Sequence, residues 1–193
     1  RLAEVSKPFV RSTFVMGAEQ AIRQVQTEFR FEPIAGRVDD VMESRTGMIV
    51  DTNKRTATQL RNVIESHLVE GESLAKLKPA IKEFFDDSYA AYRAKRIART
   101  ETIWAFNHGA VEGYRQSRVV EAKEWLTAMD DRTCEFCSGM DRKIVGIIDN
   151  YFDKGSTYEG NDGGIIHLDY EDVGHPPLHS NCRCTIIPVL KKV

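Results

Sequence analysis

All four cysteines of this 193-residue chain lie in its last third, in two groups that are far apart along the sequence. The first group is a CxxC motif, and the second is the run His175-Pro-Pro-Leu-His179-Ser-Asn-Cys182-Arg-Cys184. A CxxC turn can direct two thiolates at one tetrahedral ion, and the spacing of His179 and Cys182 allows a similar turn. Cys182 and Cys184 point the same way from an extended segment. The pattern predicts a zinc site that uses four of five donors: Cys134, Cys137, His179, Cys182 and Cys184.

Two alternatives to a metal remain open for the cysteines. Four cysteines allow three disulfide pairings and the sequence selects none of them, while the thiols could also all stay reduced. The first residues, Arg1 to Pro8, lack the apolar segment of a signal peptide, and no apolar run is long enough to span a bilayer. We therefore expect a reducing compartment, which favours a metal over disulfides.

The motifs of common catalytic sites are absent from the sequence. There is no HxE followed by PCxxC, which zinc deaminases require, and no HExxH, GxSxG, P-loop or GxGxxG motif. The CxxC follows a mostly helical region, whereas a thioredoxin-type site would accompany a βαβ pattern. Asp130, Asp131 and His167 are the residues left for a metal-dependent hydrolase, and such residues are common in loops without catalysis. We predict a structural metal and no enzymatic activity.

Composition and charge are those of an ordinary folded protein with a modest basic segment. Hydrophobic residues make up 41% and charged residues 29% of the chain, and the formal net charge is −2. Residues 1–118 carry a small positive excess and residues 119–193 a negative one, so neither part is a polybasic tail. The candidates for contact with DNA or with an acidic protein surface are Arg93, Lys95, Arg96 and Arg99. A solvated helix face is the alternative interpretation.

Residues 1–118 have the apolar periodicity of helices, and the pattern changes from residue 119 onward to short strands and polar loops. The predicted helices cover residues 8–30, 38–42, 51–71, 73–85 and 88–118. The predicted strands cover residues 119–127, 143–148, 164–168 and 185–190, with a loop rich in Asp, Gly and Asn over 153–164.

The expected fold is therefore α+β, with a helical region 1–118 that includes a long helix and a small β-rich module 119–193. A module with so little apolar surface commonly needs a metal or a disulfide to be stable. A zinc ion bound by both cysteine groups would supply that stability, because its binding free energy becomes folding free energy.

Three further residues or segments are distinctive. Trp104 and Trp125 are predicted to anchor the core or an interface, as large aromatic residues usually do. Arg99-Thr-Glu-Thr102 is predicted to lie on a helix surface, with threonine hydroxyls bonded back to helix carbonyls. A buried Arg–Glu clamp that holds the helix to the C-terminal module is the alternative for this segment.

Four motifs in this order resemble the phage Mu protein F-like family, the phage head morphogenesis proteins that include the SPP1-type minor head proteins. The motifs are Ile97-Ala-Arg-Thr-Glu-Thr102, Lys123-Glu-Trp-Leu-Thr-Ala128, Asp130-Asp-Arg-Thr-Cys-Glu-Phe-Cys137 and His175-Pro-Pro-Leu-His-Ser-Asn-Cys-Arg-Cys184. The resemblance covers about residues 60–188, and residues 1–60 carry no matching motif. In some members Arg and His stand at the positions of Cys134 and Cys137, and a His there can also bind zinc.

The resemblance implies a minor head protein of a tailed phage or prophage that assists head assembly beside the portal. Its implied partners are the portal protein, other head proteins and double-stranded DNA, with no membrane and no small-molecule substrate. Its implied location is the phage head, or the host cytoplasm during assembly. The alternatives are a zinc-stabilised nucleic-acid-binding module and, less favoured, a metal-dependent hydrolase or toxin. The CxC pair and the acidic balance of residues 119–193 argue against an ordinary zinc ribbon.

Overall fold

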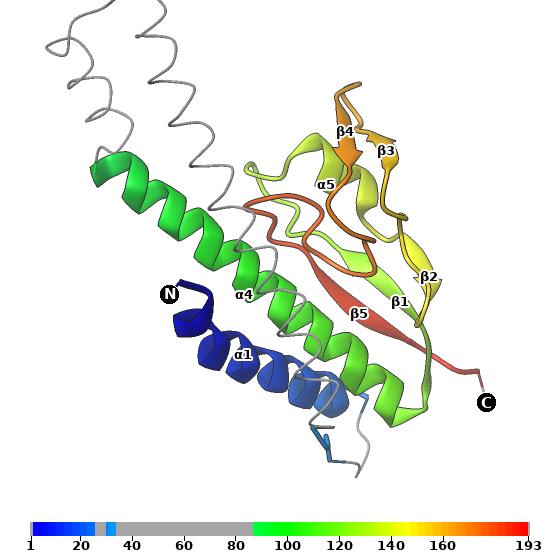
Figure 1. Ribbon diagram of the computed structural model, residues 1–193. Coiled ribbons are helices and arrows are strands. Elements are labelled where there is room, and N and C mark those ends of the chain that lie inside the picture. Colours follow the sequence, from blue (N-terminus) through cyan, green and yellow to red (C-terminus); the bar gives the residue numbers. More distant parts are fainter. Residues whose placement is uncertain (1, 26–29, 34–86, 193) are drawn as a thin grey trace, which may run out of the picture. The chain divides into compact units, whose positions relative to one another are not determined.

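The structure is a computed structural model that describes residues 2–25, 30–33 and 87–192, without the side chains of residues 2–7, 9, 87–95 and 97 (Figure 1). The helices predicted over residues 38–42, 51–71 and 73–85 lie outside the described residues. The chain divides into two compact units, Arg1–Pro8 with Ile34–Arg96 and Phe9–Pro33 with Ile97–Val193. The contacts described below belong to the second unit.

The described elements are two long helices, one short helix and five strands. In chain order they are α1 (Leu2–Gln24), α4 (Asp87–Ser117), β1 (Val120–Leu126), α5 (Glu135–Met140), β2 (Ile144–Gly146), β3 (Ser156–Glu159), β4 (Ile165–Leu168) and β5 (Thr185–Leu190). This mixture of helices and small antiparallel sheets confirms the predicted α+β class.

The three-stranded sheet has the order β2-β1-β5, and both of its strand pairs are antiparallel. Glu124 pairs with Ile144 of β2, and Leu126 pairs with Thr185 of β5. The last pair is important for the site, because it places the residues after β1 beside those before β5. The chain segments that carry the two groups of cysteines therefore start from neighbouring strands.

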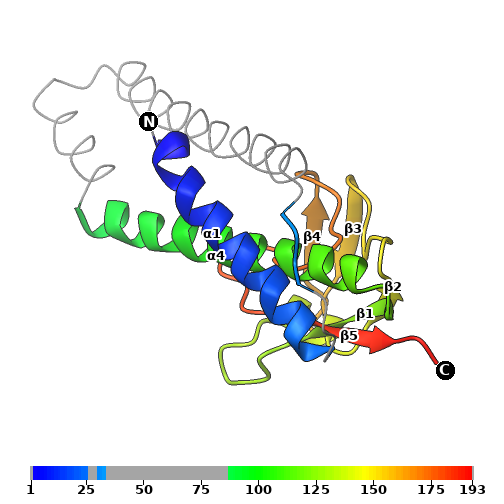
Figure 2. The same ribbon diagram turned by 90° about the horizontal axis from the view of Figure 1, so that it is seen from below.

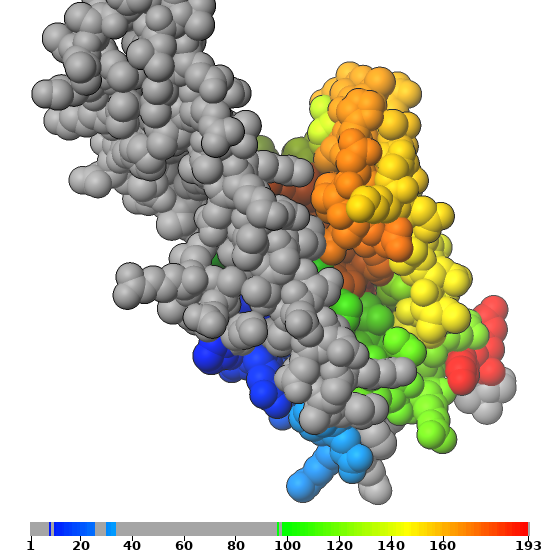
Figure 3. All heavy atoms as spheres, in the orientation of Figure 1, coloured from blue at the N-terminus to red at the C-terminus, as the bar shows by residue number. Residues whose placement is uncertain are grey.

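A second, two-stranded sheet consists of β3 and β4, with Ser156 opposite Leu168 and Glu159 opposite Ile165. Figure 3 shows this hairpin on the surface of the molecule, in yellow and orange. The prediction of a loop over residues 153–164 was wrong for the four residues of β3. Thr157 and Glu159 are exposed and Tyr158 is half-buried, the alternation of a strand with one covered face. The Asp, Gly and Asn residues on either side form the turns rather than the strand.

The first helix differs from its predicted extent at both ends. It begins at Leu2, so Pro8 lies inside the helix rather than in its first turn. It ends at Gln24, and Arg30 is not helical. Close to the end, the Val25 N–H bonds to the Ile22 carbonyl at 3.2 Å, an i→i−3 contact that tightens the last turn.

Within the second unit, α1 and α4 approach closely because glycines face the neighbouring backbone. A Cβ atom at Gly109 would overlap the carbonyl oxygen of Phe14, and a Cβ atom at Gly17 would overlap that of Phe106. Figure 1 shows the two helices side by side, with α4 between α1 and the sheet, and in the view of Figure 2 α1 crosses in front of α4. Val25, Tyr114 and Ile186 belong to one buried cluster, so this helix pair shares a core with the sheet.

Both tryptophans are buried, which confirms that they anchor the core. Trp104 is 7% exposed and Trp125 is fully buried. Trp125 belongs to the second core cluster, which includes Met140, Leu168 and Leu178 together with three of the four cysteines. Three of the five candidate metal donors, Cys137, Cys182 and Cys184, therefore lie in this hydrophobic cluster, and Cys134 packs against it.

Candidate metal centre

The CxxC motif lies at the start of the short helix α5. Cys134 is its N-cap residue, with an extended backbone, and the Cys137 N–H points at the Cys134 Sγ atom at 3.4 Å. The Cys134 sulfur therefore lies at the N-terminus of α5, close to a backbone N–H group. Cys137, in the first turn, is buried, whereas Cys134 is half-buried.

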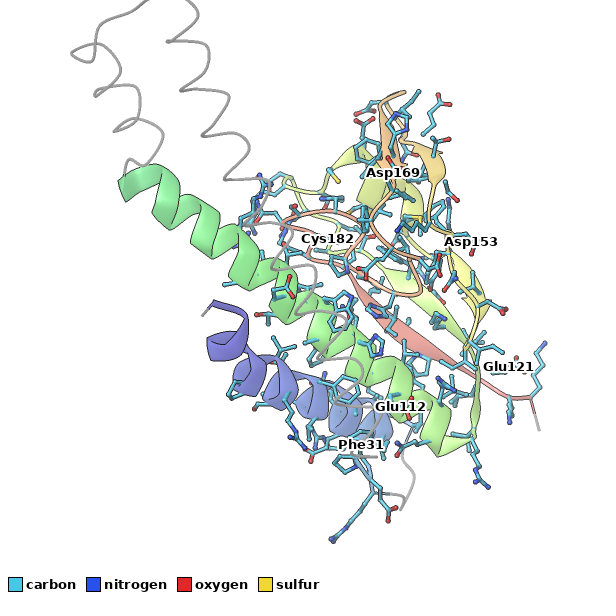
Figure 4. The ribbon with its side chains drawn as sticks, in the orientation of Figure 1. Phe31, Glu112, Glu121, Asp153, Asp169 and Cys182 are labelled. Carbon is cyan, nitrogen blue, oxygen red and sulfur yellow. The ribbon has the colours of Figure 1, made fainter. Side chains whose placement is uncertain are left out.

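The second group of donors lies in the loop before β5. The Cys182 N–H bonds to the His179 carbonyl at 3.2 Å, which closes the turn between these two donors. Asn181 has a φ of 65°, a left-handed conformation that Asn tolerates better than most residues. Cys182 and Cys184 are both buried, and Figure 4 labels Cys182 in this loop.

The two groups meet in space. The His179 Nε2 atom lies 3.0 Å from the Cys134 Sγ atom and 3.2 Å from the Cys137 Sγ atom. The Cys137 and Cys182 Sγ atoms are 3.7 Å apart. Zinc–sulfur bonds of about 2.3 Å in a tetrahedron would place two sulfurs roughly 3.7 Å apart. All four cysteines are free, so none of the three possible disulfide pairings is present.

The five predicted donors form two overlapping groups of three. One consists of Cys134, Cys137 and His179, and the other of Cys137, Cys182 and Cys184, with all ligand atoms of each group within 4.8 Å of one another. Cys137 belongs to both groups. The donor set fits zinc, because thiolates and imidazole are its usual protein ligands in structural sites.

The protonation of His179 suits a metal ligand. Its Nδ1 atom lies 2.8 Å from the Ser180 carbonyl oxygen, which can only accept a hydrogen bond. The Nδ1 atom therefore donates to this carbonyl, and the Nε2 atom, which faces the sulfurs of Cys134 and Cys137, is the ring nitrogen that could bind a metal. A carbonyl that fixes the tautomer in this way is a common partner of metal-binding histidines.

His175, the other histidine of the motif, lies outside both groups. Its Nδ1 atom is 2.7 Å from the Pro176 carbonyl, and its Nε2 atom is 2.9 Å from the Nδ1 atom of His108. Its ring also contacts the ring of Trp104 edge to face. His175 thus joins the loop before β5 to α4.

The buried thiols share hydrogen bonds that move their pKa values apart. The thiols of Cys137 and Cys182 lower the pKa of Cys184 to about 3. The hydrogen bond between Cys137 and Cys182 raises the pKa of Cys137 well above its ordinary range. Metal binding requires deprotonated cysteines, so a divalent cation bound here would favour the thiolate forms of its ligands.

Two threonines that the sequence analysis did not single out as site residues contact this cluster. The buried Thr127 donates a hydrogen bond from Oγ1 to the Cys137 carbonyl at 2.8 Å, and the same atom is 3.6 Å from the Cys184 Sγ atom. Thr100 accepts a hydrogen bond from the Asn181 N–H at 3.2 Å. The position of Thr127 could have been inferred from the sequence, because residues two apart in a strand lie on the same face and Trp125 is a predicted core residue.

The structure also places the other predicted residues. The Thr102 hydroxyl donates to the Ala98 carbonyl at 2.8 Å, which confirms the predicted back-bonding. Arg96 and Arg99 are exposed on α4, while Arg93 and Lys95 belong to the same helix with side chains outside the described part.

The residues considered for a hydrolase do not come together. His167 is exposed on β4, and Asp130 forms a bidentate ion pair with Arg183. The hydrogen bond from Arg183 holds the pKa of Asp130 well below its usual range. Within the residues that the structure describes, Asp130, Asp131 and His167 form no group with the spacing of metal ligands.

These features define an α+β protein with small antiparallel sheets and a partly buried Cys/His cluster. A family model described as phage Mu protein F like protein matches residues 58–187. The chain belongs to the phage Mu protein F-like family, over nearly the range that its motifs predicted. This is a family of structural phage head morphogenesis proteins. Comparisons with curated proteins and with solved structures find no match. Among the described residues, no helix is long and apolar enough to cross a membrane.

Proposed function

We propose that this chain is a minor head protein of a tailed phage or prophage, which assists procapsid assembly near the portal. The observation that carries the proposal is the family match over residues 58–187. Its partners would be the portal protein and other head proteins, in the phage head or in the host cytoplasm during assembly. The role is structural, so its failure would appear as a defect in particles rather than a loss of turnover.

The experiment that tests this role is gene replacement in a phage that encodes the chain. A version with an early stop codon is expected to yield few normal heads by electron microscopy, and the intact gene supplied in trans should restore them. Co-purification of portal protein with the tagged chain from infected cells is the second expected result. Normal, filled heads without the chain would contradict the proposal.

A structural zinc ion is the second part of the proposal. It would be held by four of the five donors Cys134, Cys137, His179, Cys182 and Cys184, whose ligand atoms lie in two groups around Cys137. Bound there, zinc would join α5 to the loop before β5 and stabilise the module that we assign to residues 119–193. The support comes from the donor types, the sulfur spacing and the tautomer of His179.

DNA handling is the third part of the proposal, through basic residues of α4. Arg93, Lys95, Arg96 and Arg99 all belong to this helix, and the last two are exposed. Contacts with phosphates would make the affinity for DNA fall steeply with salt. An acidic surface of the portal is the other partner that this charge would suit.

A gel-shift titration with duplex DNA at two salt concentrations tests this third part. The wild-type chain should bind more weakly at the higher salt, and a variant with Arg93, Arg96 and Arg99 changed to Ala should bind more weakly with a smaller salt dependence. Replacing Arg132 and Arg142 by Ala provides a control that removes exposed charges from the β module. Equal binding of DNA by all three proteins at low salt would contradict a role of these α4 residues in DNA binding. Tight, sequence-selective binding would favour a nucleic-acid-binding module over a head protein.

A further inference from the structure

Arg183 stands between two of the candidate zinc donors, Cys182 and Cys184, and its side chain leaves the cluster to reach another loop. Its guanidinium group forms two parallel hydrogen bonds with the Asp130 carboxylate, Nη1 to Oδ2 at 2.6 Å and Nη2 to Oδ1 at 2.5 Å. Both side chains are partly covered, with 26% of Arg183 and 32% of Asp130 exposed. A paired geometry of this kind fixes orientation as well as distance.

Asp130 is in turn fixed within the loop that leads to Cys134. Its Oδ1 atom accepts the Arg132 N–H at 3.0 Å, and its own N–H donates to the Thr133 Oγ1 atom at 3.0 Å. The Thr133 N–H donates to the Asp130 carbonyl at 2.9 Å, which closes the turn. The carboxylate is therefore part of a rigid turn that ends at the first residue of the CxxC motif.

The ion pair joins the two halves of the candidate site across 53 residues of sequence. Two other contacts hold the same halves together without a metal. Leu126 pairs with Thr185 at the ends of β1 and β5, and Thr127 contacts both the Cys137 carbonyl and the Cys184 sulfur. Thr185 follows the candidate donor Cys184 directly, and Thr127 contacts Cys137 and Cys184 themselves.

We infer that Arg183 is a positioning residue for the zinc site: through Asp130 it sets the CxxC helix and the Cys182–Cys184 segment at the separation that a single ion requires. This inference rests on the proposed structural zinc. When the ion pair already holds the ligands in place, metal binding does not have to pay the entropy cost of ordering the two loops. The Arg183–Asp130 pair should therefore raise the affinity of the site for zinc. Neither Arg183 nor Asp130 belongs to the two groups of candidate ligands, so their role would be indirect.

The test compares four forms of the full chain: wild type, Asp130→Asn, Arg183→Ala and Arg132→Ala. Asp130→Asn keeps the size of the side chain and one acceptor oxygen, but it loses the charge and the second acceptor. Arg132→Ala is the matched control, because Arg132 contacts the same carboxylate at 3.1 Å from a side chain that is 74% exposed. Zinc affinity is measured by competition with a chromophoric chelator, and the coordination geometry by the absorption of the Co²⁺-loaded forms.

Zinc affinity is expected to fall by about 10–100-fold in Asp130→Asn and Arg183→Ala, the usual effect of losing an outer partner of a metal site. Their Co²⁺ spectra should depart from that of the wild type, whereas Arg132→Ala should match the wild type in both measurements. If Arg183→Ala does not fold, Asp130→Asn decides alone. Affinity and spectrum unchanged in Asp130→Asn would overturn the positioning role while leaving the zinc site intact. A wild-type chain that binds no zinc would overturn the site and this inference together.

Discussion

Asn107 of α4 is hydrogen-bonded to the backbone on both sides of Thr185, at the start of β5. Its Nδ2 atom donates to the Cys184 carbonyl at 3.3 Å, and its Oδ1 atom accepts the Ile186 N–H at 3.2 Å. The side-chain amide occupies the position that a neighbouring strand would take at the outer edge of β5. Asn107 is fully buried, so its contacts are shielded from water. The long helix thereby reaches the backbone of a candidate metal donor.

Replacing Asn107 by Ala should destabilise the second unit although Ala is the better helix former. The Ile186 N–H would lose its partner in a buried position, which should lower the free energy of unfolding by about 1–3 kcal/mol. Denaturant titration followed by circular dichroism measures the change. Asn150→Ala is the control, since Asn150 is exposed and its side chain donates a hydrogen bond to Asp153 on the surface; it should change stability by no more than about 0.5 kcal/mol. Equal effects of the two substitutions would contradict the structural role of Asn107.

Cys137→Ser should impair zinc binding more than any other single cysteine substitution. Cys137 is the donor common to both groups, so its loss leaves neither group with three ligands. Zinc content after gel filtration is the measurement. Cys134→Ser and Cys184→Ser are the matched comparisons, and at least one of them should retain zinc because each of these cysteines belongs to one group only and the other group keeps its three ligands. One zinc ion per chain in the Cys137→Ser variant would show that Cys137 is not a zinc ligand.

Gly109→Ala should be destabilising, against the normal sign for glycine in a helix. An exposed helical glycine replaced by alanine gains about 1 kcal/mol, but the added Cβ at Gly109 would overlap the Phe14 carbonyl oxygen. Forcing α1 away from α4 should cost about 1–3 kcal/mol, measured by thermal or denaturant unfolding. Glu19→Ala, on the exposed side of α1, is the control and should change stability by less than about 0.5 kcal/mol. A stabilised Gly109→Ala protein would mean that the two helices do not pack as described.

Lys123 is a buried cation whose replacement should destabilise the sheet. Its Nζ atom donates to the carbonyl oxygens of Gly146, Ile147 and Asp149 at 3.1, 2.9 and 2.7 Å. Lys123→Met keeps the length of the side chain and removes every donor, which should lower the free energy of unfolding by about 1–3 kcal/mol. The exposed Lys154, changed to Met, serves as the control in the same unfolding assay. No difference between the two variants would exclude a stabilising role for the lysine.

The sequence was sufficient to predict the α+β class and where most strands of the β module lie. Strands β1, β2, β4 and β5 fall within the predicted segments because their apolar runs are bounded by turn residues. The prediction missed β3, since only one of its residues is a large apolar one and Asp, Gly and Asn residues surround it. It also placed the end of α1 too late, because apolar spacing continues to Phe29 and does not reveal where the helix hydrogen bonds stop.

The candidate site was predictable as a set of donors but not as an arrangement. Cysteine and histidine types with the spacing of a turn are visible in the sequence, and the structure brings all five into two adjoining groups. The contacts of Thr127, Arg183 and Asn107 depend on the register of β1 against β5 and on the rotation of α4. The contacts of Thr127 with Cys184, of Arg183 with Asp130 and of Asn107 with Cys184 connect residues 57, 53 and 77 positions apart, and local patterns hold no information on them.

The most direct test of the central claim is the zinc content of the purified full chain, measured by elemental mass spectrometry and followed by unfolding with and without a chelator. The account predicts about one zinc ion per chain and a lower unfolding midpoint once the ion is removed. A chain purified without metal, with four oxidised cysteines and an unfolding midpoint that the chelator does not change, would contradict it.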